Sequence, residues 1–380
     1  MTKKIVFYLS SYGFGHATRM IPIIHALLSR SNFEIFVKTT VPEWLLMNSF
    51  SEKDKKKVRY EFSKNDVGVR NTPTLQIDIL ETSKAIKQMI HKKQEFIAKE
   101  LKFCQKNEVD MIICDIPPLP FLVAKEIGIH GIGISNFNWY DNYEYVYQKK
   151  ATDLSSPSLE IELEEIKAAY NLADLFLELP FATQNNIFRN KLEIPLAVRK
   201  TTRQQLEIKE LLNIKKDQNL IFLSLGWHDI KDARNILSDL MSLKDVKNYI
   251  FLLSANLQKY IDSQNHIRFL PSKDPNSQDY VAACDLVISK LGYGIVSECV
   301  ANGIPMIYTI RENYFEDIVM GKKLNSLGMS RFLATKQFIR GNWIDLIEDA
   351  ISLKESAKMK EDINGAEVCV HHILDFLNNN

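Results

Sequence analysis

Residues 286–310 limit the fold of this 380-residue chain more than any other stretch. Both ends of the stretch are short apolar runs of the kind that form buried strands. Between them, Gly292 and Gly294 precede a helical segment that stops at Gly303, because glycine readily takes the left-handed conformation that ends helices. A strand, a helix and a second strand in this order form a parallel βαβ unit. We therefore predict a parallel α/β sheet.

The start of this helix has the features of a phosphate site. Backbone N–H groups and the positive end of the helix dipole both favour a phosphate there. Glu298 lies one turn into the helix, where its carboxylate can accept hydrogen bonds from a ribose. We interpret the stretch as a nucleotide-diphosphate site.

The N-terminal end of the chain has the same layout. The apolar run 5–9 predicts a strand, Gly13 and Gly15 follow it, and a helix starts near His16. Because 380 residues exceed one ordinary core, we expect two α/β domains. We place them at 1–198 and 199–362, followed by a terminal helix at 363–380 that can cross back to the first domain.

His16 is the leading candidate for chemistry. At a helix start the dipole disfavours the imidazolium, so a neutral base is available near pH 7. A histidine that only caps or packs the helix fits the same pattern. The flanking glycines leave these two interpretations equally open.

Asp115 follows the apolar strand predicted over 109–114. In open α/β sheets, ligands bind at the carboxyl ends of the strands, so Asp115 can face the same crevice as His16. A carboxylate behind a histidine fixes its tautomer and stabilises the imidazolium that forms on proton abstraction. An aspartate that caps the next helix is the equally weighted alternative.

A polar and aromatic cluster at 136–143 follows the next predicted strand. Its amides and ring faces suit a sugar or another polar acceptor, whereas a surface helix start with packed aromatics explains it equally well. To acceptor binding we assign Tyr12, Arg19, Asn136, Asn138 and Trp139.

Charge and composition exclude several classes of protein. Forty-eight basic and 47 acidic residues give no net field that would attract nucleic acid. No apolar run reaches the roughly 20 residues of a membrane span, and five cysteines without metal-ligand spacing suit reduced core positions in the cytoplasm. The Lys-rich run 52–59 predicts a solvated loop or helix end, with peripheral contact to an anionic membrane as the secondary interpretation.

Together these motifs resemble the GT-B glycosyltransferases. Residues 289–298 are similar to the donor loop of the bacterial peptidoglycan N-acetylglucosaminyltransferase family. A closer resemblance, over nearly the whole chain, is to the glycosyltransferase-like domain of plant L-arabinokinases and its free-standing bacterial relatives. It rests on 13–19, 135–139, 290–298, 311–315 and 364–367. The resemblance implies two Rossmann-like, doubly wound domains that face an interdomain cleft.

The resemblance also implies roles for individual residues. His16 and Asp115 match the His–Asp dyad of small-molecule UDP-glycosyltransferases, and Glu298 matches the glutamate that binds the UDP ribose. Lys290 stands where the peptidoglycan enzyme has arginine, and Glu316-Asp317 stand where it has two glutamines. The implied donor-binding set is Gly15, Gly226, Lys290, Gly292, Tyr293, Gly294, Ser297, Glu298, Glu316 and Asp317.

The sequence thus predicts an inverting glycosyltransferase that moves a sugar from a nucleotide-diphosphate donor, expected to be a UDP-sugar, to a hydroxyl acceptor. His16 is the expected general base. No metal or other cofactor is expected, because a helix dipole can hold the leaving diphosphate. Two alternatives stay open: a nucleotide-sugar hydrolase or epimerase of the same fold, and a non-catalytic nucleotide-sugar sensor.

Overall fold

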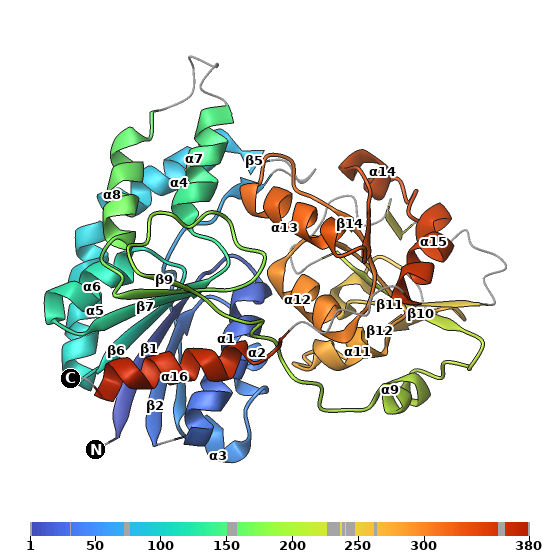
Figure 1. Cartoon of the computed structure of the whole chain (residues 1–380), viewed down its shortest axis with the longest axis horizontal. Coiled ribbons are helices and arrows are strands. Elements are labelled where there is room, and N and C mark those ends of the chain that lie inside the picture. The colour runs from blue at the N-terminus through green and yellow to red at the C-terminus, as the bar shows by residue number, and fades with distance from the viewer. Residues whose placement is uncertain are drawn as a thin grey trace.

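The computed structural model describes residues 2–30, 32–71, 77–149, 158–225, 236–237, 240, 248–261, 264–355 and 362–378. Two parallel sheets, each with helices around it, form the two lobes of Figure 1. Gly226, predicted to bind the donor, lies outside the described residues.

The first lobe is built on a seven-stranded sheet in the order β3-β2-β1-β6-β7-β8-β9, and every neighbouring pair is parallel. Its strands are β1 (Lys3–Leu9), β2 (Phe33–Thr39), β3 (Val58–Phe62), β6 (Met111–Asp115), β7 (His130–Ser135), β8 (Leu175–Glu178) and β9 (Lys191–Glu193). A separate two-stranded sheet joins β4 (Arg70–Asn71) to β5 (Ile77–Asp78). The helices of this lobe are α1 (Phe14–Arg30), α2 (Glu43–Met47), α3 (Glu52–Lys55), α4 (Ile79–His91), α5 (Lys93–Asn107), α6 (Leu119–Ile127), α7 (Trp139–Lys149) and α8 (Glu160–Tyr170).

The second lobe holds a six-stranded parallel sheet in the order β12-β11-β10-β13-β14-β15. Its strands are β10 (Asn219–Ser224), β11 (Tyr249–Leu253), β12 (Ile267–Phe269), β13 (Leu286–Lys290), β14 (Met306–Thr309) and β15 (Ser330–Phe332). The described helices of this lobe are α9 (Gln205–Leu211), α11 (Ser277–Ala283), α12 (Tyr293–Asn302), α13 (Phe315–Ser326), α14 (Thr335–Ile339) and α15 (Ile347–Ser352), and the chain then continues into α16 (Gly365–Asn378). Short 3-10 turns span Ala255–Leu257, Ile344–Leu346 and Leu353–Glu355.

The βαβ unit predicted at 286–310 is present as β13, α12 and β14. Gly303 ends α12 in the left-handed conformation, at φ 66°. The strands are buried on both faces, which explains their continuous apolar sequence. Two parallel sheets of this kind confirm the expected pair of Rossmann-like domains.

Strand order places the crevices of both sheets at matching points. In the first sheet, β1 lies between β2 and β6. In the second sheet, β10 lies between β11 and β13. The chain thus builds each sheet outward on one side of its first strand and then on the other, so the direction of winding reverses there. Ligands bind at such switch points, beyond the carboxyl ends of the strands. At this end of the first sheet Leu9 pairs with Asp115, which brings the loop before His16 next to that carboxylate.

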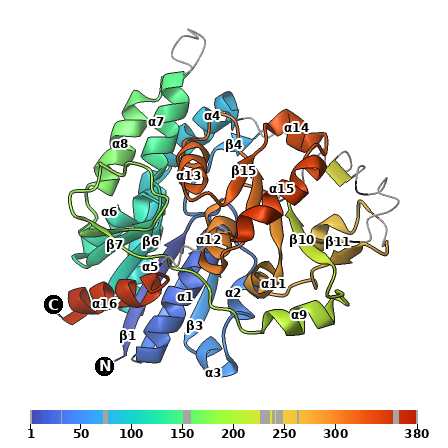
Figure 2. The ribbon, with the colours of Figure 1, turned by 45° about the vertical axis from the view of Figure 1, so that its right-hand side comes forward.

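The C-terminal helix α16 lies along α1 on the first lobe, as both views show (Figures 1 and 2). Arg30 donates to Glu367 at 2.6 Å. A Cβ on Gly365 would stand 2.1 Å from the carbonyl oxygen of Pro195, so only glycine permits this approach. The chain therefore returns to the first lobe after the second sheet. Among the described residues no helix is long and apolar enough to cross a bilayer.

Candidate active site

The two glycine-rich loops meet between the lobes. A Cβ added to Gly15 would stand 3.6 Å from the backbone nitrogen of Gly294, and one added to Gly294 would stand 2.9 Å from Thr18 Oγ1. The N-termini of α1 and α12 are therefore in backbone contact. Gly13 has φ +99°, a conformation that side chains rarely adopt, which lets the chain turn from β1 into α1.

A cavity of about 560 Å³ opens beside this contact and is lined from both lobes. Its size lies within the range of small-ligand sites. Ten of the predicted site residues line it: Tyr12, Gly15, His16, Arg19, Lys290, Gly292, Tyr293, Gly294, Glu298 and Glu316. The sequence motifs from the two halves of the chain thus come together in one place.

Other predicted residues are buried outside the cavity lining. Trp139 donates its ring N–H to Asp66 at 2.7 Å, and Asn138 accepts from the backbone N–H of Asp141 at 2.8 Å, which caps the start of α7. Asp115, Asn136, Ser297 and Asp317 are also buried. Asn138 and Trp139 therefore stabilise the first lobe and do not line the cavity.

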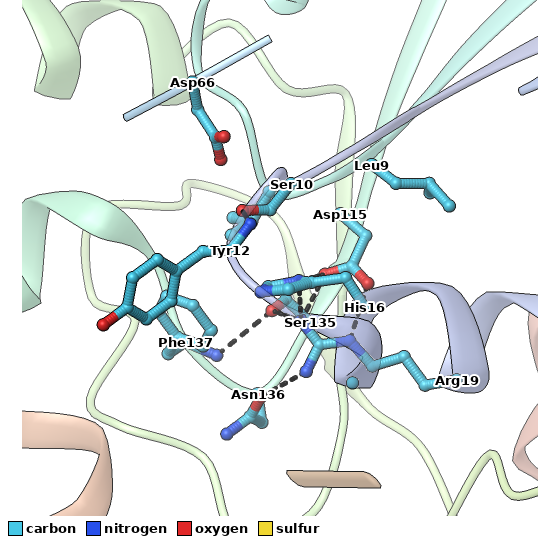
Figure 3. A network of polar contacts seen from close by, with 12 residues as sticks. Leu9, Ser10, Tyr12, His16, Arg19, Asp66, Asp115, Ser135, Asn136 and Phe137 are labelled. Carbon is cyan, nitrogen blue, oxygen red and sulfur yellow. Dashed lines mark hydrogen bonds and ion pairs between the residues drawn. The ribbon is translucent and has the colours of Figure 1, made fainter. Parts of the chain in front are cut away.

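His16, Asp115 and Arg19 form a compact network (Figure 3). His16 Nδ1 lies 3.1 Å from Asp115 Oδ1. Arg19 grips the same carboxylate with two groups: its Nε donates to Oδ2 at 2.6 Å, and its Nη2 donates to Oδ1. Such a bidentate pair fixes the plane of the carboxylate. Arg19 thus holds the partner of His16.

His16 Nδ1 lies between two groups of this network. It is 3.1 Å from Asp115 Oδ1 and 2.9 Å from Arg19 Nη2, a nitrogen that also donates to Asp115 Oδ1 and, at 2.9 Å, to Ser135 Oγ. The two hydrogens of Nη2 face three acceptors when Nδ1 is unprotonated, and two when Nδ1 carries a hydrogen and donates it to Asp115. The second tautomer leaves the lone pair of the neutral ring on Nε2.

The electrostatics of this network keep Asp115 ionised. Full burial by itself would raise the pKa of the carboxyl group, but the charge of Arg19, followed by the interaction with His16, outweighs it and holds the pKa of Asp115 below its usual value. A charged carboxylate is the form that can orient the imidazole.

Glu298 has a charged partner in the chain segment between the two sheets. Arg199 donates to Glu298 Oε1 from Nε at 3.1 Å and from Nη2 at 2.5 Å. Arg199 also bonds the backbone oxygen of Pro275 and, at 2.9 Å, Ser277 Oγ. Glu298 is therefore held rigidly at the cavity wall, with both arginine bonds on one of its two oxygens.

Lys290 and Arg311 supply positive charge beside the glycine loop. Arg311 is committed to Asp317, to which it donates from its backbone N–H at 2.7 Å and from Nε at 2.9 Å. No described residue bonds the Lys290 ammonium. Burial, together with the nearby charge of Arg311, lowers the pKa of Lys290 to about 8. The cavity thus contains a cation that is poised for an anionic ligand.

Residues 3–340 match the family described as Glycosyl transferase family 1. The chain belongs to this family. L-arabinokinase of Arabidopsis thaliana is 23% identical to this glycosyl transferase family member over 376 residues, which are 97% of the chain and 34% of the plant protein. The chain therefore spans about a third of the length of that curated relative.

Solved structures of similar fold cover both lobes. UGT2 of Phytolacca americana, complexed with UDP-2fluoro-glucose and pterostilbene, matches with a TM-score of 0.61 and 14% identity, over 99% of this chain and 100% of that one. MnaA of S. aureus in a co-structure with UDP matches with a TM-score of 0.61 and 16% identity, over 99% and 97%. These matches confirm the GT-B fold.

Sequence reasoning missed several residues of the site. Arg199 is buried in an irregular connection, and no spacing or motif in the sequence distinguishes it from the other basic residues of the chain. Asp66, which accepts from the backbone N–H of Ser11 at 3.1 Å and from Trp139, lies in a loop without pattern. The sequence predicts acceptor binding for Arg19, whereas the structure shows that its guanidinium binds the carboxylate of Asp115. A buried ion pair depends on three-dimensional packing, which local periodicity does not report.

Proposed function

We propose that this protein is an inverting glycosyltransferase that transfers a sugar from a UDP-sugar to a hydroxyl acceptor. One observation carries the proposal: a histidine backed by a buried carboxylate lines the same cavity as a glycine-flanked helix N-terminus, and the two come from opposite lobes. A base facing a phosphate site is the arrangement that a direct displacement at a sugar requires.

The donor lies against the second lobe. Backbone N–H groups at the start of α12 hold the diphosphate, and Glu298, fixed through Oε1 by Arg199, binds the ribose with its other oxygen. Glu316 lines the cavity and binds hydroxyls of the transferred sugar. UDP is favoured as the nucleotide because two proteins of the same fold were solved with UDP or a UDP-sugar.

The acceptor lies against the first lobe, beside His16, Tyr12 and Phe137. His16 Nε2 takes the proton of the acceptor hydroxyl as its oxygen bonds to the anomeric carbon. The bond from that carbon to the phosphate oxygen breaks, and UDP leaves with the electron pair. Asp115 holds the imidazole in the required tautomer and stabilises the imidazolium. Attack from the face opposite the leaving group inverts the anomeric configuration.

The leaving diphosphate gains negative charge during this step. The positive end of α12 and the Lys290 ammonium supply the compensating charge, so we expect transfer without a divalent metal. Transfer that persists in excess chelator tests this expectation.

Two measurements test the proposed function. A thermal-shift screen across nucleotides and nucleotide sugars should find UDP-linked ligands, because a ligand of the native state raises stability. Glu298→Ala should abolish the UDP shift, and an unchanged shift would place the ribose elsewhere. Product analysis with and without an acceptor pool then separates the reactions. A glycoside and UDP support transfer, whereas free sugar formed equally fast without acceptor indicates hydrolysis. An isomerised nucleotide sugar indicates epimerisation, and tight binding without turnover indicates a sensor.

A further inference from the structure

A continuous chain of hydrogen bonds runs from His16 in the first lobe to Glu316 in the second. His16 contacts Asp115, and Asp115 is gripped by Arg19. Arg19 Nη1 donates to Asn136 Oδ1 at 2.5 Å, and Asn136 Nδ2 donates to Glu316 Oε1 at 3.0 Å. The carbonyl oxygen of the Asn136 amide therefore accepts from Arg19 in the first lobe, and its NH2 group donates to Glu316 in the second lobe. Figure 3 shows the part of this chain from His16 to Asn136.

Asn136 is fully buried, and it lies outside the cavity lining. This position does not suit a residue that binds the acceptor directly. Arg19 and Glu316, which it joins, both line the cavity. The side chain thus sits behind the site and connects the group that orients the base with the group assigned to the sugar.

We propose that Asn136 is a positioning residue that holds His16 in register with the transferred sugar across the cleft. This inference rests on the proposed function of the same site. A carboxylate oxygen has lone pairs for more than one donor, so Glu316 Oε1 binds a sugar hydroxyl while keeping Asn136. Binding of the sugar then fixes Glu316, Asn136, Arg19 and Asp115 in sequence.

The physical reason is geometric. The base is carried by one lobe and the anomeric carbon by the other, so the attacking oxygen is aligned only when the lobes keep a fixed relation. Misplacement of reacting groups by about 1 Å costs on the order of 100-fold in rate. A buried chain of charge-assisted bonds supplies that relation without touching UDP, whose proposed ligands all belong to the second lobe or to Arg199.

The structure provides a matched control. Asn142, on α7, accepts from the backbone N–H of Glu316 at 3.2 Å. It thus joins the same two lobes at the same residue, but its bond bypasses Arg19. A purely structural contribution to lobe packing should be shared by Asn136 and Asn142, whereas a contribution to base positioning belongs to Asn136.

The test is Asn136→Asp, assayed with a UDP-sugar and the acceptor on which the wild type is active. This change keeps an acceptor for Arg19 and removes the donor to Glu316. We expect kcat to fall about 10- to 100-fold, a larger share of donor to be hydrolysed by water, and the dissociation constant of UDP to stay unchanged. Asn142→Ala should keep the wild-type kcat and the wild-type ratio of transfer to hydrolysis.

A rescue separates positioning from damage to the fold. In N136D/E316Q the donor and acceptor of the cross-lobe bond are exchanged. The N136D change should therefore cost much less in the E316Q background than in the wild type, as a double-mutant cycle measures. Equal costs in the two backgrounds, an unchanged kcat in N136D, or an equal loss in N142A would each overturn the inference. The same assay measures transfer by the wild type. Absence of wild-type transfer would contradict the proposed function, whereas the variant results above would contradict only the role of Asn136.

Discussion

Gly15 and Gly294 touch across the two lobes, with Gly294 N 3.6 Å from where a Cβ of Gly15 would stand. The contact joins a helix N-terminus of the first sheet to one of the second. It explains the absence of a side chain at Gly294, where a Cβ would crowd Thr18 Oγ1, whereas a Cβ on Gly15 would stand at an ordinary contact distance. The candidate active site thus depends on backbone approach as well as on its charged groups.

Substitution of Gly294 should disturb this contact more than substitution of Gly15. A Cβ on Gly294 would stand 2.9 Å from Thr18 Oγ1, which must shift. We expect Gly294→Ala to cost about 1–3 kcal/mol in the free energy of unfolding, whereas Gly15→Ala makes ordinary contacts. Urea unfolding measures both. Adding Thr18→Ala should restore most of the stability of G294A, and the absence of any restoration would contradict the steric explanation.

Arg19 should contribute more to the stability of the fold than a residue that only binds the acceptor substrate would. Its removal leaves Asp115 charged and buried with only His16 beside it. We expect Arg19→Ala to lower the free energy of unfolding by about 3–5 kcal/mol. The cost in an Asp115→Ala background should be clearly smaller, because no carboxylate is then stranded. An equal cost of Arg19→Ala in the wild type and in Asp115→Ala would contradict a stabilising interaction between Arg19 and Asp115.

Acid titration gives an independent view of the same pair. The pKa of Asp115 is lower in the folded chain than in the unfolded chain, so its stabilisation is complete above the unfolded value and is lost as pH falls below roughly 4. Arg19→Ala should show a weaker dependence of unfolding free energy on pH in this acid range. An unchanged slope would contradict the assigned role of Arg19.

Lys290 predicts how UDP binding depends on pH. Its pKa of about 8 means that the ammonium is charged below that pH and neutral above it. A diphosphate binds the charged form more tightly, so the dissociation constant of UDP should rise as pH increases through this range. Lys290→Arg keeps its charge and should remove the rise between pH 7 and 9. Calorimetric titration of both proteins measures it, and identical pH dependence in the two would exclude Lys290 as a phosphate ligand.

The sequence predicted the sheets and the position of the cleft better than it predicted the supports of the site. Buried parallel strands need unbroken apolar runs, and both glycine loops have a local signature. The pairing of Leu9 with Asp115 then brings His16 to its carboxylate. In the charge run 52–59, residues 52–57 form the short helix α3 and the turn after it with no buried side chain, as predicted, whereas residues 58–59 begin the edge strand β3, with Val58 buried.

The partners of the charged residues could not be read from the chain. Arg19 and Asp115 are 96 residues apart, and Arg199 and Glu298 are 99 apart. Each pair forms because strand order and packing bring distant segments together. Asn136 illustrates the limit: its amide type and place after β7 were visible, but the cross-lobe bond to Glu316 was not.

The most direct test of the account is the turnover of His16→Ala in a transfer assay, together with its affinity for UDP. Removal of a general base should lower kcat by about 10²- to 10⁴-fold. The dissociation constant of UDP should be unchanged, because the proposed ligands of the diphosphate and the ribose are α12 and Glu298. His25→Ala, a histidine farther along α1 that bonds the backbone oxygen of Ser49, should keep full activity. Full transfer by the His16 variant, with UDP still bound, would contradict the mechanism.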